Sequence, residues 1–168
     1  DINITMGYPL RYTSVYSLVR RLLEMQRKAR IEGSIVLFEH QDVDRIITDT
    51  LISGLFNEQD QNISKEVISK NLFRISSDLF SGSELLSEIF SKPGSPALLS
   101  EYLRNILLRI SSGDSLRNSS GDNETGEKSA NESAQIRIRN EFIYSMCLSL
   151  NRLDAVAANP QRRIAVST

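Results

Sequence analysis

The stretch "ITMGYPLRYTSVYSLVRRLLEMQRKAR", Ile4 to Arg30, decides the fold that the sequence predicts. Its first residues alternate between apolar and polar, which favours a short half-buried strand. Gly7 and Pro9 end that strand, because glycine adopts conformations closed to other residues and proline donates no ladder hydrogen bond. Thr13 or Ser14 then caps an amphipathic helix that continues to the end of the stretch. The apolar arc of this helix consists of Val15, Leu18, Val19, Leu22, Leu23 and Met25.

The opposite side of this helix is basic and is the candidate DNA-binding surface. Long cations there can reach backbone phosphates. A solvated face moderated by Glu24 explains the same pattern, and charge runs are more often solvent-facing than ligand-binding. The candidate DNA-binding residues are Arg20, Arg21, Arg27 and Lys28. Nearby tyrosines could stack on bases, although aromatic side chains near a helix start more often fill the core. These are Tyr8, Tyr12 and Tyr16.

Further helices are predicted where apolar residues recur at helical spacing. They span about 42–54, 63–72, 83–90, 95–110 and 136–156. The run Ile35–Phe38 is too short to separate a buried strand from the approach to a helix. Residues 163–168 have the pattern of a strand. The fold class predicted is therefore all-α, with about five or six helices and short extended ends.

Residues 111–134 interrupt the apolar pattern with "SSGDSLRNSSGDNETGEKSANESA". This segment contains a single leucine and no aromatic residue. It cannot bury enough apolar surface to offset the entropy lost on ordering. We therefore predict a mobile loop between the last two helices.

Composition limits the classes of protein that fit. The chain has 168 residues, 40% of them hydrophobic and 24% charged, which suits one globular domain. Its net charge of −1 means that a nucleic acid would meet a local basic patch. No apolar run approaches the roughly 18 residues that cross a bilayer, so we expect a cytoplasmic protein without a membrane partner. The first residue, Asp1, favours a piece of a longer protein, and Cys147 is expected to be a buried, inert thiol.

The sequence offers no recognisable catalytic or metal-binding residues. It lacks phosphate-cradling GxxxxGK[ST], dinucleotide GxGxxG and nucleophile GxSxG motifs. His40 has no second ligand at metal spacing, which favours a polar residue near a helix start. Asp42, Asp44 and Asp49 have the spacing of solvated partners of a helix dipole. We therefore expect no enzymatic activity, metal or cofactor in this segment, and a small enzyme with an unrecognised site is the weakest alternative.

The opening residues carry a family resemblance. "INITMGYPLRYTSVYSLVRRLLEMQ" resembles the "VTMGYPL…TPVYSLI..LL.LQ" segment of AddB-like proteins of Bacteroidetes, which pair an inactivated superfamily I helicase region with a PD-(D/E)XK nuclease domain. Three later stretches are compatible with that family: "FEHQDVDRIITDTLISG", "NEFIYSMCLSLNRLDAV" and "RRIAVST". Two positions depart from its pattern, because Ser14 replaces a usual proline and "LISG" replaces "HPYI".

The resemblance implies a helical insertion in a helicase-like core, comparable to subdomain 2B of related helicases. Residues 1–12 would then be the end of a core strand and its exit loop, 13–159 the helical domain, and 160–168 the return segment. The parent would process DNA ends in recombinational repair, and any use of ATP and Mg²⁺ by the parent would involve residues outside this segment. The implied partners are DNA, bound weakly and without sequence preference, the remaining domains of the parent and a helicase–nuclease partner subunit.

A second class of function remains open on the sequence alone. The chain could be a stand-alone helical protein-interaction module with no DNA role, in which residues 111–134 present a partner motif. The two readings differ in genomic context, because only the inserted subdomain requires the reading frame to continue past Thr168 into a helicase-like segment and a nuclease domain.

Overall fold

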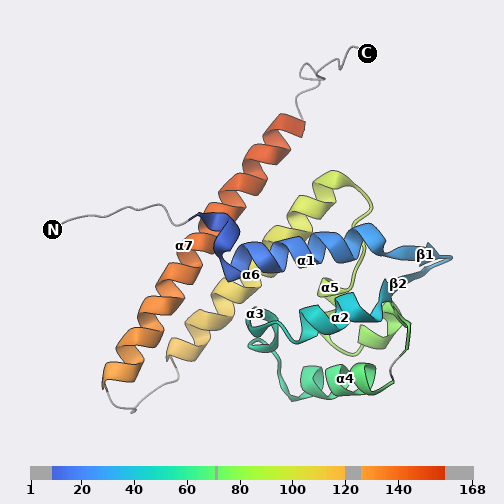
Figure 1. Cartoon of the computed structure of the whole chain (residues 1–168), viewed down its shortest axis with the longest axis horizontal. Helices are drawn as coiled ribbons and strands as arrows, with labels where there is room; N and C mark the ends of the chain where they lie inside the picture. Colours follow the sequence, from blue (N-terminus) through green and yellow to red (C-terminus); the bar gives the residue numbers. More distant parts are fainter. Residues whose placement is uncertain (1–8, 71, 120–125, 158–168) are drawn as a thin grey trace.

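The computed structural model describes residues 9–70, 72–119 and 126–157 (Figure 1). Within these ranges the chain is mostly helical, with seven α-helices, two 3₁₀ turns and a small antiparallel sheet. The α-helices are α1 (Ser14–Lys28), α2 (His40–Ile47), α3 (Thr50–Ser53), α4 (Glu58–Ser69), α5 (Glu84–Ile89), α6 (Pro96–Ser119) and α7 (Gly126–Ala157). The other elements are η1 (Leu10–Tyr12), β1 (Arg30–Glu32), β2 (Ile35–Glu39), β3 (Arg74–Ser76) and η2 (Ser77–Phe80).

Helix α1 begins and packs as the sequence predicts. The Thr13 hydroxyl caps it by accepting from the Tyr16 N–H at 3.1 Å. The predicted apolar arc is buried with the exception of Leu23, which is 38% exposed. Gln26, only 8% exposed, lies on the buried side instead. The apolar face of α1 contacts α2, α3, β2 and α7, so this helix joins elements from both ends of the chain.

The prediction of an all-α fold is wrong in one respect, because the structure contains a three-stranded antiparallel sheet in the order β1-β2-β3. A two-residue turn joins β1 to β2, and Gly33 occupies it with φ 64, a conformation that favours glycine. The run Ile35–Phe38 is thus part of a strand. Its second partner, β3, lies far along the chain, with Phe38 opposite Ile75, and both side chains are buried. A pairing between strands so far apart in the chain leaves no local pattern in the sequence.

The predicted helix at 42–54 is divided into α2 and α3. The break falls at Asp49, whose carboxylate accepts from the Leu51 N–H at 3.0 Å and so caps α3. Helix α4 starts earlier than predicted, because Asn57 and Asp60 form a reciprocal capping box at its first turn. Ser83 caps α5 as the sequence indicates.

Three phenylalanines form the aromatic centre of the core beneath the sheet. Phe80 and Phe90 stack with their ring centroids 4.0 Å apart, and Phe38 meets Phe90 edge to face at 5.7 Å. All three are essentially inaccessible to solvent. They come from β2, η2 and the end of α5, so this cluster fixes the sheet against the following helical segment.

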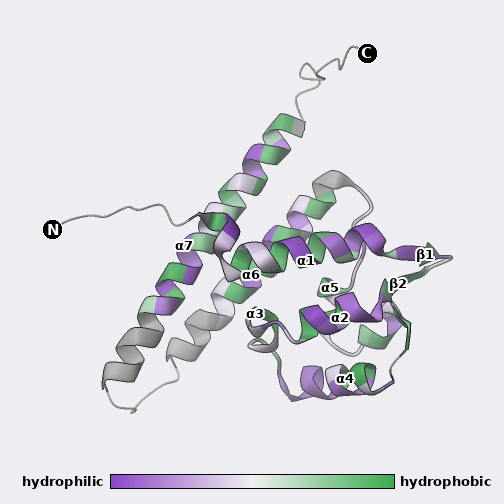
Figure 2. Ribbon diagram, viewed as in Figure 1, coloured by the Kyte–Doolittle hydropathy of each residue, from purple (hydrophilic) through white to green (hydrophobic). Residues whose placement is uncertain are grey.

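Helices α6 and α7 lie side by side and antiparallel at the edge of the molecule (Figure 1). Their seam buries Leu103, Leu107 and Ile110 from α6 together with Ile143, Met146 and Leu150 from α7. The Arg104 guanidinium donates to Asn151 at 2.5 Å and to Asp154 at 2.8 Å. Hydrogen bonds from Ser100 and then Arg104 hold the pKa of Asp154 below its ordinary value. Figure 2 shows the mixture of polar and apolar residues along both helices.

The predicted loop at 111–134 is largely helical. Its first part, 111–119, continues α6, and its last part, 126–134, opens α7, while 120–125 lies outside the described residues. Adding residues to an anchored helix costs far less than nucleating one, so poor apolar content did not end these helices. The segment also packs at Gly113, where a Cβ would lie 2.3 Å from Leu55 Cδ2. The predicted extended ends at 2–6 and 163–168 also lie outside the described residues.

None of the helices in the described ranges combines the length and apolar character required of a transmembrane span.

Substitution of Phe90 by Ala tests the aromatic core. Removing a fully buried ring that contacts two others should lower the free energy of unfolding by about 3 to 5 kcal/mol, measured by urea denaturation. Phe73→Ala is the matched control, since Phe73 is 81% exposed. Similar losses in the two variants would contradict the described packing.

Candidate nucleic-acid interface

The structure places all four candidate cations on α1 but gives them different surroundings. Arg20 is 70% exposed and pairs with Glu24 one turn away, with Nε and Oε1 3.2 Å apart. Such exposed i,i+4 pairs are weak. Arg21 instead reaches off the helix to Asp49, whose carboxylate is 9% exposed, with an Nη1–Oδ2 distance of 2.6 Å. Arg20 is therefore easily released to a ligand, whereas Arg21 links α1 to the start of α3.

Lys28 is held more firmly still. Its Nζ donates to both oxygens of Asp42, at 3.0 and 3.2 Å, and to Glu39 at 3.3 Å. These hydrogen bonds, the one to Asp42 first, raise the pKa of Lys28 above its usual 10.5. Asp42 is 5% exposed, and its other cation is Arg45 at 3.9 Å. Lys28 therefore neutralises a buried carboxylate.

Arg27 has no such partner. It is exposed, and it forms no ion pair with any residue that the structure describes. It borders a cavity of about 510 Å³ between α1 and the start of α6. The basic side of α1 is thus divided: Arg21 and Lys28 bind carboxylates of neighbouring helices, whereas Arg20 and Arg27 face outward.

Two interpretations of this region need correction. Asp42 and Asp49 do lie in or before the first turn of helices, as predicted, but Asp42 is buried and Asp49 half-buried, and each binds a cation of α1. Tyr12 and Tyr16 are 61% and 39% exposed, so they do not fill the core. The Arg11 guanidinium lies 4.7 Å from the centre of the Tyr12 ring. Tyr8 lies outside the described residues.

Sequence reasoning missed Lys92. It lies in the connection between α5 and α6, and its ammonium donates to the Ala29 carbonyl at 2.5 Å, which brings a fifth cation to the end of α1. Lys92 and Arg27 line the same cavity. Only the tertiary fold brings these residues together, so no motif or spacing in the sequence indicates the pairing.

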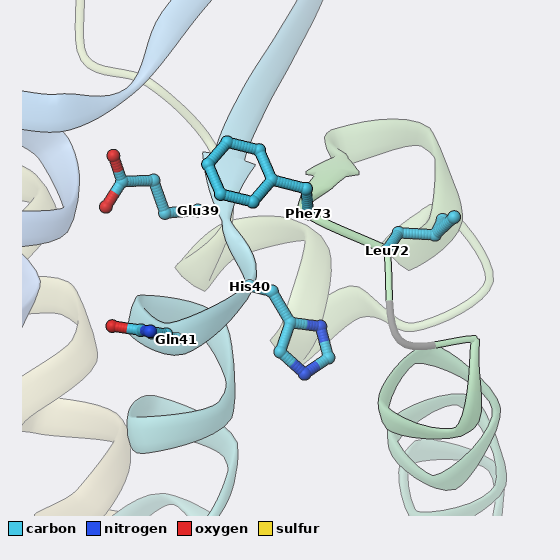
Figure 3. Close-up of a pocket in the computed structure, with 5 residues that line it drawn as sticks. All are labelled: Glu39, His40, Gln41, Leu72 and Phe73. Atoms are coloured by element: carbon cyan, nitrogen blue, oxygen red, sulfur yellow. The ribbon is translucent and has the colours of Figure 1, made fainter.

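His40 lies at a second, smaller cavity of about 330 Å³, shown in Figure 3. As predicted, it starts a helix, and its backbone N–H donates to the Phe73 carbonyl at 3.2 Å. The side chain points away from the Phe73 ring, and its buried Nδ1 meets no hydrogen-bond partner within the described ranges. In that part of the chain no group of three or more His, Cys, Asp or Glu residues is placed to hold a metal ion.

Cys147 is half-buried, not fully buried as expected. Desolvation raises the pKa of its thiol, an effect that outweighs the opposing influence of Arg104. At neutral pH the residue stays protonated, which fits the predicted inert thiol because the thiolate is the nucleophilic form.

No family model, curated protein or solved structure matches this chain.

Replacement of Lys28 by Gln should destabilise the fold. The change leaves Asp42 buried with a distant cation, and such an uncompensated charge is costly. We expect a lower urea midpoint at pH 7 and substantial recovery in K28Q/D42N, where the buried charge is also removed. Lys65→Gln on the exposed side of α4 serves as the control.

The same interaction has a defined pH dependence. Because folding raises the pKa of Lys28, its contribution to stability is complete below pH 10.5 and is lost as the pH rises through the higher folded value. The difference in stability between the wild type and K28Q should therefore shrink above pH 10.5. A difference that stays constant across this range would contradict the assignment.

Proposed function

We propose that this chain is a non-catalytic, 2B-like helical subdomain of a helicase/nuclease-type protein that processes DNA ends in recombinational repair. In this role it contacts the DNA backbone or regulates the core that carries it. The family comes from the resemblance of residues 2–26, and the stretch 14–26 of that match forms most of α1, the helix on which the fold is assembled.

The observation that carries the DNA role is the outward orientation of Arg20 and Arg27. Exchange of an exposed carboxylate for a phosphate costs little, so the Arg20–Glu24 pair opposes binding only weakly. Arg27 has no ion pair to give up among the described residues. Two such contacts on a chain of net charge −1 give weak, salt-sensitive binding that does not depend on sequence.

The position of α1 supports an inserted subdomain. The first and last helices of the described fold, α1 and α7, contact each other. An insertion must leave its parent and return to it at neighbouring points, and contact between its terminal helices suits that requirement. Because α1 contacts α7, a movement of α1 on DNA binding would act directly on α7. This suits a regulatory link to the core.

A protein-interaction role is the second candidate. Large apolar side chains remain exposed along α7, including Tyr144 at 67%, Leu153 at 63% and Val156 at 55%. The remaining domains of a parent protein or a separate partner subunit could cover them. This role needs no cation on α1, so loss of the outward arginines separates it from the DNA role.

The DNA role predicts the effect of R20Q/R27Q. If both arginines neutralise phosphates, the slope of log K against log salt should fall by about 1.4 to 1.8, since each contact contributes about 0.7 on single strands and 0.9 on duplex. Fluorescence anisotropy with short single-stranded and duplex DNA measures this slope. Glutamine retains helix propensity and much of the stem, so helicity should not change.

The matched control is K65Q/K70Q, which changes Lys65 on α4 and Lys70 at its C-terminal cap. Lys70 has an i,i+4 partner in Glu66, as Arg20 has in Glu24, while Lys65 resembles Arg27 in being exposed. Both double variants remove the same charge. Equal slopes for the two variants, or no DNA binding by the wild type, would refute the proposed contact.

A further inference from the structure

The cavity beside Arg27 has a cationic and apolar lining. Its volume is about 510 Å³, within the range of small-molecule sites. Figure 1 shows the α5–α6 connection passing the end of α1, and the cavity lies between them. Among the residues that the structure describes, no carboxylate lines it. The lining residues are Leu23, Gln26, Arg27, Lys92, Pro93, Gly94, Ser95 and Leu99.

Lys92 is fixed at this cavity without being neutralised. Its bond to the Ala29 carbonyl, 2.5 Å long, uses one of three ammonium donors and leaves the positive charge in place. Neither Lys92 nor Arg27 makes an ion pair with a carboxylate in the part of the chain that the structure describes. Two cations from separate segments therefore border one cavity, and both can donate to an anion.

Gln26 supplies a second, independent feature. It is 8% exposed, and its amide nitrogen donates to the Ser91 carbonyl at 2.7 Å. Its buried side-chain oxygen accepts no hydrogen bond from any described residue. The Gln26–Ser91 hydrogen bond ties this wall of the cavity to the segment that precedes Lys92.

We propose that this cavity binds one nucleotide unit of a DNA strand. The phosphate lies against Arg27 and Lys92, and the sugar and base lie against the apolar side chains Leu23, Pro93 and Leu99. The positive end of α6, whose first turn contains no acidic residue, adds to the attraction for phosphate.

This inference rests on the proposed DNA role and makes it more specific. It assigns Arg27 to a built site shared with the α5–α6 connection, whereas Arg20 remains a simple surface contact. A phosphate that bridges Arg27 and Lys92 forms charge-assisted hydrogen bonds with two segments at once, and such bonds are stronger than neutral ones.

The experiment titrates the whole chain with inorganic phosphate, thymidine 5′-monophosphate and a short oligothymidylate, followed by NMR of backbone and glutamine side-chain amides. The nucleotide should shift signals of Gln26, Gly94 and Ser95 and bind about tenfold more tightly than phosphate. The oligonucleotide should shift the same signals. R27Q and K92Q should each weaken nucleotide binding about tenfold, the factor that corresponds to about 1.4 kcal/mol.

Two further variants keep the result interpretable. K65Q removes a charge from α4 and should leave nucleotide affinity unchanged. K92R keeps the cation and should retain most of the affinity, whereas a merely structural role of Lys92 would appear as a lower melting temperature in K92Q without a change in binding by the folded fraction. Equal weakening by K65Q and R27Q would overturn the site.

The remaining outcomes separate this site from the DNA role. Salt-dependent DNA binding without shifts at the cavity would overturn the site and leave the proposed function standing. Nucleotide binding at the cavity without any binding of the oligonucleotide would refute the DNA role and the assignment to a strand. Equal affinity for phosphate and nucleotide would reduce the site to an anion site and overturn the nucleotide assignment.

Discussion

Burial of the apolar face of α1 is the interaction on which the described fold depends. Val15, Leu18 and Leu22 on this face are completely buried, and the helix contacts α2, α3 and β2 as well as α7. The aromatic cluster and the α6–α7 seam each stabilise their own region, but α1 joins the sheet region to the last helix.

The polar side of α1 follows from the same packing. Once α2 and α3 lie beside α1, the carboxylates at their starts come within reach of its cations, and Arg21 and Lys28 bind Asp49 and Asp42. These two cations therefore contribute to the fold. Arg20 and Arg27 point away from α2 and α3, so the geometry that fixes one pair leaves the other pair accessible. The four cations of α1 look alike in the sequence, but the neighbouring helices divide them into one pair that binds carboxylates of α2 and α3 and one pair that is exposed.

Local signals predicted much of this structure, and distant contacts account for what they missed. The period of the apolar residues and the cap at Thr13 located α1, and similar patterns located α5 and most of α6. The β1–β2 hairpin turns at Gly33, which indicates only a break in the sequence, and β3 could not be predicted because Ile75 pairs with the distant Phe38. The loop prediction failed because α6 and α7 extend beyond their apolar stretches. For the candidate site, the sequence identified the four cations but not the carboxylates that bind Arg21 and Lys28, nor Lys92.

The proximity of Lys92 to α1 bears on how a ligand would act. Lys92 is bonded to the carbonyl of Ala29, the residue that ends α1, and Gln26 is bonded to the carbonyl of Ser91. These two bonds already tie the α5–α6 connection to the end of α1. A phosphate shared by Arg27 and Lys92 would add a third link at the same place, and a ligand that binds only the folded chain stabilises it. Binding at this corner would thus be transmitted to α6 and, through the α6–α7 seam, to the last helix of the described fold.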